Sequence, residues 1–288
     1  MTQPVFLDYD QAALDRQYDQ RAWAPNAVTV IARYAADSAA ARDRLGAPQV
    51  LRYGASSPET LDLYRAGGPA APIHVFVHGG AWTRMNARDS AAPAPLFIGA
   101  GAHFAALDFA LLPSVELTEM VTQVRRAVAW LYRHAAEFGG DPARIHVSGH
   151  SSGAHLSALL CETDWPDDFG LPADTVKSAL LVSGSYDLRP VRLSARSSYV
   201  KLTDATEHAL SPQRHAARLG CPVIVAYAEH DTDEFRRHAR DFHAAIIAAG
   251  RLVPPLVRGA GMNHFEFIET LAHADGVLGR AALSQMGL

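Results

Sequence analysis

The stretch of sequence that most constrains the fold is Gly149-His150-Ser151-Ser152-Gly153, which matches the pattern G-x-S-x-G. An apolar run typical of a strand precedes it, and an apolar, helix-forming run that begins at Ala154 follows it. In this context the pattern predicts a sharp turn that exposes the hydroxyl of Ser151, because small residues two places away on either side let the strand and the helix approach each other. The pattern alone occurs by chance in many loops. The rest of the chain must therefore supply a base, an acid and an oxyanion hole.

Strands and helices alternate along most of the chain. We expect strands over residues 50–53, 61–64, 73–77, 103–107, 144–148, 176–182, 221–227 and 252–257, with the first two forming a hairpin. Pro254 and Pro255 place the last strand at an edge. Helices are expected over 116–138, after residue 153, over 234–249 and at the end of the chain. The alternation predicts the α/β class, with a mostly parallel sheet of about eight strands and helices on both faces.

Two segments are candidates to lie over the mouth of a site. Residues 1–46 read as a helical arm, with helices over 11–18 and 28–44 and a C-cap at Gly46. The arm either packs across the mouth or is a plain surface extension. Residues 185–215 are polar, irregular and rich in Ser and Arg, which predicts a lid segment. The segment contains three arginines that could bind an acidic substrate: Arg189, Arg192 and Arg196. The favoured alternative is that they form a solvated loop face. No repeat or linker divides the chain, so we expect one domain over 1–288.

Composition excludes several classes of protein. The chain has 288 residues, a net charge of −4 and no basic stripe, which argues against a nucleic-acid partner. No apolar run approaches the length of a membrane span, and the first residues lack the pattern of a signal peptide. Cys161 and Cys221 are expected to be buried free thiols. These features predict a cytoplasmic enzyme with a small-molecule substrate and no membrane partner, and they leave a homodimer open.

A serine hydroxyl becomes a nucleophile only beside a general base, which in turn needs an orienting acid. In sheets of parallel strands such groups lie at the carboxyl ends of the strands. Asp231 lies just past the strand over 221–227, and His264 lies in the loop after the last strand, so both follow Ser151 in the order serine, acid, histidine. We predict that these three residues are catalytic. Asp233 and Glu229 are weaker candidates for the acid.

Acyl transfer also needs backbone N–H donors for the developing oxyanion, and the loss of one donor typically costs on the order of 3 kcal/mol. One predicted donor is the amide of Ser152, directly after the candidate nucleophile. The other predicted donors are the amides of Gly79 and Gly80, which follow the buried strand over 73–77.

Other residues near these motifs are candidates for the substrate pocket. They are His78, Ala81, Trp82 and His150, and the sequence leaves open whether Trp82 lines the pocket or packs in the core. Four further histidines make no recognised metal-ligand spacing: His208, His215, His230 and His238. There is no phosphate loop and no dinucleotide-binding fingerprint. We therefore expect neither a metal nor a cofactor.

Taken together, these motifs resemble the kynurenine formamidase (arylformamidase) group of α/β-hydrolases, near the hormone-sensitive-lipase-like esterases. The resemblance runs along most of the chain. It is carried by His78-Gly79-Gly80-x-Trp82, Gly149-His150-Ser151-Ser152-Gly153, Ser183-Gly184-Ser185-Tyr186-Asp187-Leu188, Glu229-His230-Asp231 and Asn263-His264-Phe265. It implies the α/β-hydrolase fold and a catalytic triad of Ser151, Asp231 and His264, in agreement with the assignment from spacing. Ala81 departs from the group, which often has tyrosine there, and so removes a ring from the edge of the pocket.

The sequence thus predicts a cofactor-free serine hydrolase that cleaves a small aromatic amide or ester through an acyl-enzyme, as an arylformamidase does. One alternative is a small carboxylesterase of the hormone-sensitive-lipase type. Another is a catalytically silent binding protein on the same fold, against which the complete triad argues.

Overall fold

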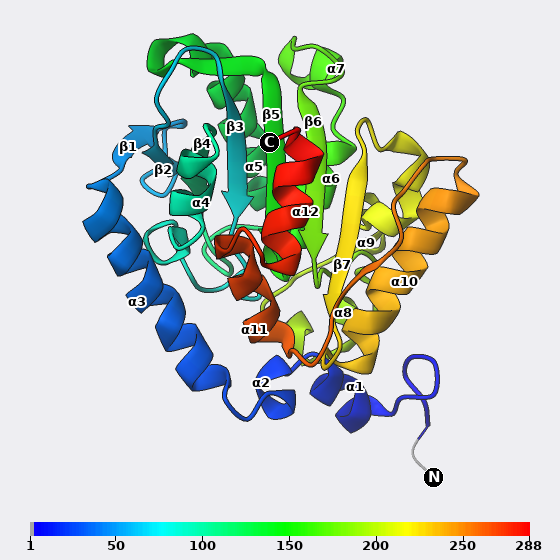
Figure 1. The fold of residues 1–288 in the computed structure, drawn as a ribbon. Coiled ribbons are helices and arrows are strands. Elements are labelled where there is room, and N and C mark those ends of the chain that lie inside the picture. Colours follow the sequence, from blue (N-terminus) through cyan, green and yellow to red (C-terminus); the bar gives the residue numbers. More distant parts are fainter. Residues whose placement is uncertain (1–2) are drawn as a thin grey trace.

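A computed structural model describes residues 3–288, and its centre is a sheet of eight strands in the order β1-β2-β4-β3-β5-β6-β7-β8 (Figure 1). The first pairings, β1 with β2 and β2 with β4, are antiparallel, and all later pairings are parallel. This confirms the predicted class and sheet. The strands are β1 (Gln49–Arg52), β2 (Thr60–Tyr64), β3 (Ala71–Val77), β4 (His103–Leu107), β5 (Gly140–His150), β6 (Val176–Val182), β7 (Val223–Ala228) and β8 (Val257–Gly259).

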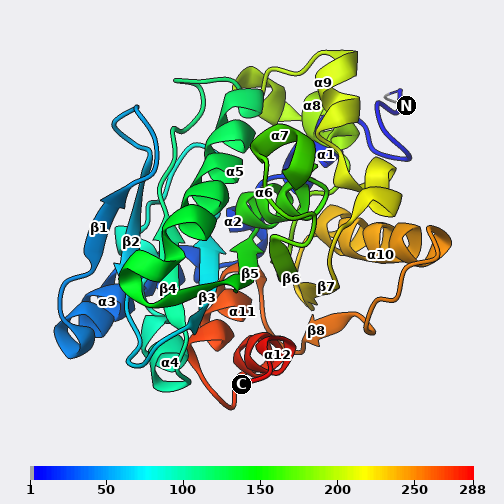
Figure 2. The same cartoon turned by 90° about the horizontal axis from the view of Figure 1, so that it is seen from above.

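Helices cover both faces of the sheet (Figure 2). One face carries α5 (Leu117–His134), α6 (Ser152–Cys161) and α10 (Asp233–Ala248), and the other carries α3 (Ala27–Leu45), α4 (Ala94–Gly99), α11 (His264–Glu269) and α12 (Val277–Met286). Strand β3 shows why its sequence is continuously apolar. Val75 and Val77 pack into the core under α5 and α6, whereas Phe76 packs into the core on the opposite face.

The shorter helices lie mostly toward the ends of the strands and in connections. They are α1 (Gln11–Gln17), α2 (Gln20–Trp23), α7 (Trp165–Phe169), α8 (Arg189–Leu193) and α9 (Asp204–Ala209), with 3-10 turns at Arg88–Ser90, Ala135–Phe138, Ala195–Ser198, Pro212–Arg218 and Thr270–Ala272. In the described part of the chain, no helix has the length and apolar character needed to cross a membrane.

Three details differ from the sequence prediction. The last strand was predicted over 252–257, but β8 begins only at Val257, because Pro254 and Pro255 have no N–H to donate to a ladder; its edge position is confirmed. Residues 185–215 were predicted to be irregular, but they contain the short helices α8 and α9. A proline in the first turn favours the start of α8, and a capping box at Thr203 favours the start of α9. Cys161 is buried as predicted, whereas Cys221 is partly exposed; both are free.

The free energy of unfolding should fall as the pH is lowered from 7.5 to 5.5. Burial lowers the pKa of His74 to about 3 and the pKa values of His78, His146 and His155 to about 4. In the unfolded chain these imidazoles take up protons near pH 6.5. Below that pH the unfolded state therefore binds more protons, and each histidine lowers the free energy of unfolding by up to about 1.4 kcal/mol per pH unit. Glu162 opposes this trend, because burial raises its pKa to about 7, but it is one group against four.

Urea unfolding followed by circular dichroism at pH 7.5, 6.5 and 5.5 measures this dependence. His146→Gln should reduce the slope, because His146 is buried against Ser178. The matched control His230→Gln should leave the slope unchanged, because His230 is exposed. A free energy of unfolding that stays constant across this range would contradict the prediction.

Candidate active site

Ser151 lies on the turn between β5 and α6 in a strained backbone conformation, with φ 56° and ψ −120°. For a residue other than glycine, such a conformation costs on the order of 1–3 kcal/mol and persists only where its surroundings enforce it. Here the amide of Ser151 donates to the carbonyl of Val182 in β6 at 2.8 Å. A Cβ at Gly153 would collide with the Val77 carbonyl of β3. The second glycine of the G-x-S-x-G pattern is therefore required for α6 to pack against the sheet.

His264 is the first residue of α11, where the side chain of Asn263 caps the helix. Its Nε2 lies 3.0 Å from Oγ of Ser151, and its Nδ1 lies 2.6 Å from Oδ1 of Asp231. Because an ionised carboxylate can only accept, Nδ1 carries the proton and donates it to Asp231. Nε2 then accepts from the hydroxyl of Ser151, so this tautomer can act as a general base.

Asp231 lies just after β7 and is 2% exposed. Its Oδ2 accepts from the amide of Ala228 at 2.8 Å and from the hydroxyl of Ser183 at 2.6 Å. These two donors fix the carboxylate, so that Oδ1 faces the imidazole of His264. The structure thus brings the three predicted catalytic residues into one hydrogen-bonded chain.

The weaker candidates for the acid have other partners. Asp233 is the first residue of α10, and its half-exposed carboxylate pairs with Arg236. Glu229 pairs with Arg258 and accepts from the amide of Gly261. Neither carboxylate contacts His264 in the described residues.

Ser183 belongs to the site, although no sequence motif assigned it a role there. It follows the last residue of β6, in a left-handed conformation with φ 50°, and this places its hydroxyl on the buried Asp231. The sequence feature that could have indicated this role is the position of Ser183 directly after a buried strand, at the same edge of the sheet as the ends of β5 and β7.

Replacing Ser183 with alanine is expected to lower kcat by about tenfold, with little change in KM. A hydrogen bond to a charged group contributes about 1.5–3 kcal/mol, and its loss lets the carboxylate, and with it the imidazole of His264, leave the reactive orientation. Steady-state kinetics with p-nitrophenyl acetate measures the effect. Ser198→Ala is the matched control, because Ser198 is exposed and its hydroxyl donates to the carbonyl of Ala195, away from the site. An unchanged kcat in Ser183→Ala would rule out the positioning role.

The predicted oxyanion loop lies against the turn that carries Ser151. The amide of Trp82 donates to Oγ of Ser152 at 3.1 Å and ties the loop to α6. Gly80 has φ 98°, a conformation that side chains rarely allow. Within residues 3–288, the amides of Gly80 and Ser152 have no acceptor. They remain available to a ligand beside Ser151.

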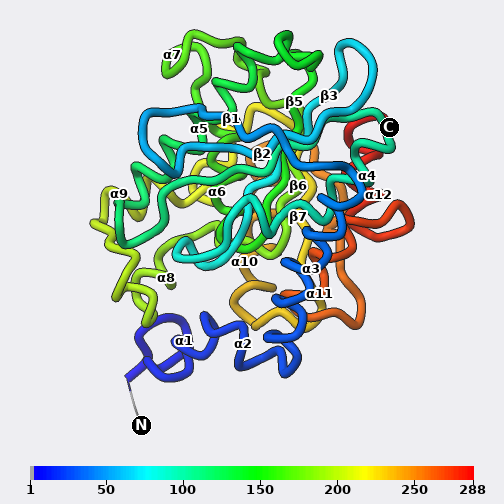
Figure 3. The backbone as a smooth tube through the Cα atoms, turned by 90° about the vertical axis from the view of Figure 1, so that its left-hand side faces the viewer, coloured from blue at the N-terminus to red at the C-terminus, as the bar shows by residue number. Residues whose placement is uncertain are grey.

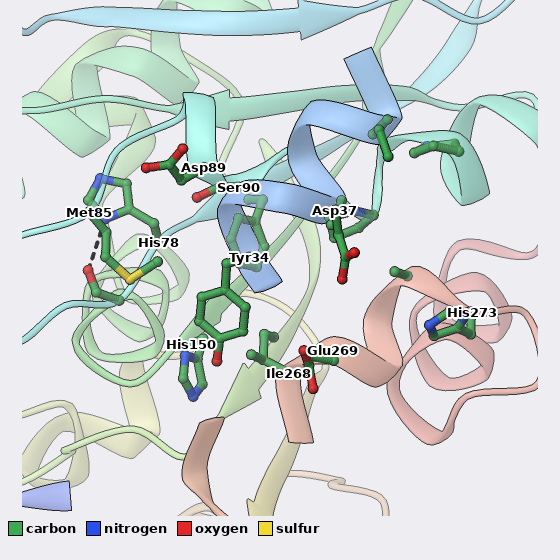
Figure 4. A pocket seen from close by; sticks show the side chains of 18 of the residues that line it. Tyr34, Asp37, His78, Met85, Asp89, Ser90, His150, Ile268, Glu269 and His273 are labelled. Atoms are coloured by element: carbon green, nitrogen blue, oxygen red, sulfur yellow. Dashed lines mark hydrogen bonds between the residues drawn. The ribbon is translucent and has the colours of Figure 1, made fainter. Parts of the chain in front are cut away.

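Two cavities open beside the loop. The smaller, of about 120 Å³, is lined by Ser151 and His264, and its other lining residues include Gly80, Ala81 and His150. The larger, of about 380 Å³, lies between α3, the segment after the oxyanion loop, and α11, and it contains none of the three catalytic candidates (Figure 4). Three residues line both cavities: Tyr34, Met85 and His150.

The four pocket candidates have different positions. Ala81 and His150 line the smaller cavity, and His78 lines the larger one. Trp82 lines neither; it is 1% exposed and packs edge-on against His155, with ring centroids 5.5 Å apart, so it belongs to the core. His150 donates from Nε2 to the carbonyl of His264 at 2.9 Å. Burial, together with the nearby His264, holds the pKa of His150 well below its usual range, so it stays neutral near pH 7.

The N-terminal arm borders the smaller cavity. In Figures 1 and 3, α1 and α2 lie at the end of the molecule where the parallel strands terminate, and residues 18–21 line the cavity. The arm is also tied to the segment 185–215, because Gln11 donates to the carbonyl of Leu193 and Ala195 donates to Asp15. Within the described residues, the arm therefore lies beside the cavity that Ser151 lines.

Among the residues that the structure describes, no group of three or more His, Cys, Asp or Glu side chains is placed to hold a metal ion. The strained serine, the imidazole that bonds to it and the buried carboxylate at the carboxyl edge of this sheet define a serine hydrolase of the α/β-hydrolase fold.

Comparison with known proteins gives the family. Kynurenine formamidase of Danio rerio is 30% identical over 287 residues, which cover 95% of this chain and 96% of that protein. The chain belongs to the kynurenine formamidase family, which confirms the resemblance seen in the sequence.

Other comparisons agree on the class. The BD-FAE family model matches residues 61–176. Esterase LipQ of Mycobacterium tuberculosis is 30% identical over 223 residues, which cover 69% of this chain and 52% of LipQ. A solved esterase of Pyrobaculum calidifontis is 19% identical with a TM-score of 0.72, covers 94% of this chain and 97% of its own, and shows the fold alone.

Proposed function

We propose that this protein is an arylformamidase, which hydrolyses a small aromatic formamide of the N-formylkynurenine type. The observation that carries the proposal is the hydrogen-bonded chain from Asp231 through His264 to Ser151 beside a small cavity. The similarity to the Danio rerio kynurenine formamidase over nearly the whole length supports the choice of substrate.

In the proposed reaction, Nε2 of His264 takes the proton of Ser151 as Oγ bonds to the formyl carbon. The amides of Gly79, Gly80 and Ser152 stabilise the oxyanion that forms. His264 then gives the proton to the leaving nitrogen, the C–N bond breaks, and the arylamine departs from a formyl-enzyme. Water attacks the formyl carbon, again with His264 as base, and formate leaves as Ser151 regains its proton. The net reaction is formamide plus water to arylamine plus formic acid.

The size of the cavity favours a small acyl group. Pockets for drug-sized ligands usually measure about 300–1,000 Å³, whereas the cavity that holds Ser151 and His264 measures about 120 Å³. We place the formyl group in this cavity. The aromatic part would then lie toward Tyr34 and Met85, where the smaller cavity meets the larger one.

A second candidate is a carboxylesterase with no preference for formamides. Two observations favour it: the similarity to esterase LipQ, and Ala81, which lines the smaller cavity without contributing a ring. The ratio of kcat/KM for N-formylkynurenine to that for phenyl acetate separates the two candidates. We expect the formamide to be the better substrate, although its amide bond is intrinsically less reactive. Turnover of phenyl acetate without turnover of the formamide would favour the esterase instead.

We also infer that residues 3–46 of the N-terminal arm and the segment over 185–215 together cover the site; residues 1 and 2 of the arm lie outside the described residues. The hydrogen bonds between them support this arrangement. A cytoplasmic location stays a prediction from the sequence.

A further inference from the structure

Arg196 is a buried cation in the wall of the smaller cavity. It is 8% exposed, and it is the one residue of the segment 185–215 in the lining described above. The other two arginines of the segment behave as a solvated loop face: Arg189 is half exposed, and Arg192 pairs with Asp204 and Glu207. Of the three arginines that the sequence offered as partners for an acidic substrate, Arg196 is therefore the one that lies in the cavity wall.

Three aromatic rings hold the guanidinium in place. Its Cζ lies 5.2 Å from the ring centroid of Tyr18, 5.7 Å from that of Trp82 and 5.8 Å from that of Phe235. Its Nη2 donates to the carbonyl of Tyr18 at 2.9 Å. The ring of Phe235 in turn lies 5.1 Å from the ring of His264. The cation is thus separated from the candidate base by a single aromatic side chain.

No carboxylate of the described residues forms an ion pair with this guanidinium. None of the ion pairs among residues 3–288 includes Arg196, and its Nη1 is buried without an acceptor. A guanidinium keeps its proton at neutral pH even when burial lowers its pKa. If Arg196 served only as a structural latch, that is, to tie its segment to the N-terminal arm, the bond from Nη2 to the carbonyl of Tyr18 would be enough. Nη1 would then carry the cost of an unpaired buried donor with no benefit.

The other charged residues that line the cavity add to the positive potential. Arg21 and Arg84 lie at the exposed rim, and Asp19, also exposed, is the single acidic residue in the lining. A cavity lined by an excess of one charge raises the local concentration of ligands of the opposite charge. The planar guanidinium fits a carboxylate in particular, because two of its N–H groups can bond to the two oxygens.

We propose that the guanidinium of Arg196 binds a carboxylate of the substrate, and so selects acidic substrates over neutral ones. This proposal rests on the proposed function only in taking the cavity of Ser151 as the substrate site. It holds for an amide or an ester substrate.

The test compares acidic and neutral substrates of the same reaction. The formamide set is 2-, 3- and 4-formamidobenzoate against formanilide, and the ester set is 2-, 3- and 4-acetoxybenzoate against phenyl acetate. We expect the wild type to prefer the best acid of a set over its neutral partner. Arg196→Met should lower kcat/KM for that acid by about 100-fold, as expected for the loss of a charged partner, and should change the neutral partner by less than about threefold. The matched control Arg189→Met should change neither.

Arg196→Lys is a second variant that keeps the test decisive if the methionine variant does not fold. It keeps the charge without the planar pair of donors, and should lose about tenfold on the acid alone. Equal losses of kcat/KM on acidic and neutral substrates in the Arg196 variants would show that Arg196 is a structural latch, and would overturn the proposal. A wild type without preference for the acids would also overturn it. If only the esters are cleaved, the arylformamidase proposal fails while the ester set still decides the role of Arg196.

Discussion

Replacing Ser151 with alanine is expected to lower kcat for p-nitrophenyl acetate by about 10⁶-fold, because the alanine has no atom that can form the acyl-enzyme. Alanine carries the same Cβ as serine, so its backbone is no more restricted at the strained φ of 56°. The variant is therefore expected to keep the same turn. Circular dichroism and the melting temperature should therefore match those of the wild type.

The remaining activity of Ser151→Ala is informative. The oxyanion amides and the cavity persist in the variant, so a residual rate above that in water is expected. Wild-type turnover in Ser151→Ala would assign the nucleophile to another residue.

The second large effect is expected for Asp231→Asn, which should lower kcat by about 10⁴-fold. Oδ2 of Asp231 faces two donors, the amide of Ala228 and the hydroxyl of Ser183. In the variant, the carboxamide oxygen is drawn to these donors, and its NH₂ group turns toward Nδ1 of His264. Nδ1 must then accept, which moves the imidazole proton to Nε2 and removes the acceptor for Ser151.

Asp233→Asn is the matched control for this variant, because the half-exposed Asp233 pairs with Arg236 outside the site. Its kcat should stay within about twofold of the wild type, in line with the small effects of surface ion pairs. Equal losses in Asp231→Asn and Asp233→Asn would contradict the assignment of the acid. Single-turnover kinetics with p-nitrophenyl acetate measures both.

The sequence could predict which three side chains come together in the site because each follows a strand. The strands over 103–107 and 176–182 match the structure residue for residue, and Ser151, Asp231 and His264 follow β5, β7 and β8, with His264 as the first residue of α11. In a parallel sheet these loops meet at one edge. Order along the chain therefore translates directly into proximity in space.

The rest of the site depends on contacts between distant segments. Arg196 looked like one of three similar loop arginines, and its burial follows from packing against Tyr18, 178 residues earlier in the chain. Trp82 could not be assigned to the pocket or the core without knowing that His155 lies at its edge. The start of β8 was missed for a local reason, because the apolar run from 252 to 257 outweighed the two prolines within it.

The most direct measurement of the central assignment is the covalent trapping of the nucleophile. A fluorophosphonate should form one P–O bond to Oγ of Ser151, with loss of fluoride, because the hydroxyl is activated by His264 at 3.0 Å. Peptide mass mapping should then find one adduct per chain, on the peptide that contains Ser151, in parallel with complete loss of activity. An inactivated enzyme with its adduct on another residue, or an enzyme that stays active and unmodified, would contradict the assignment.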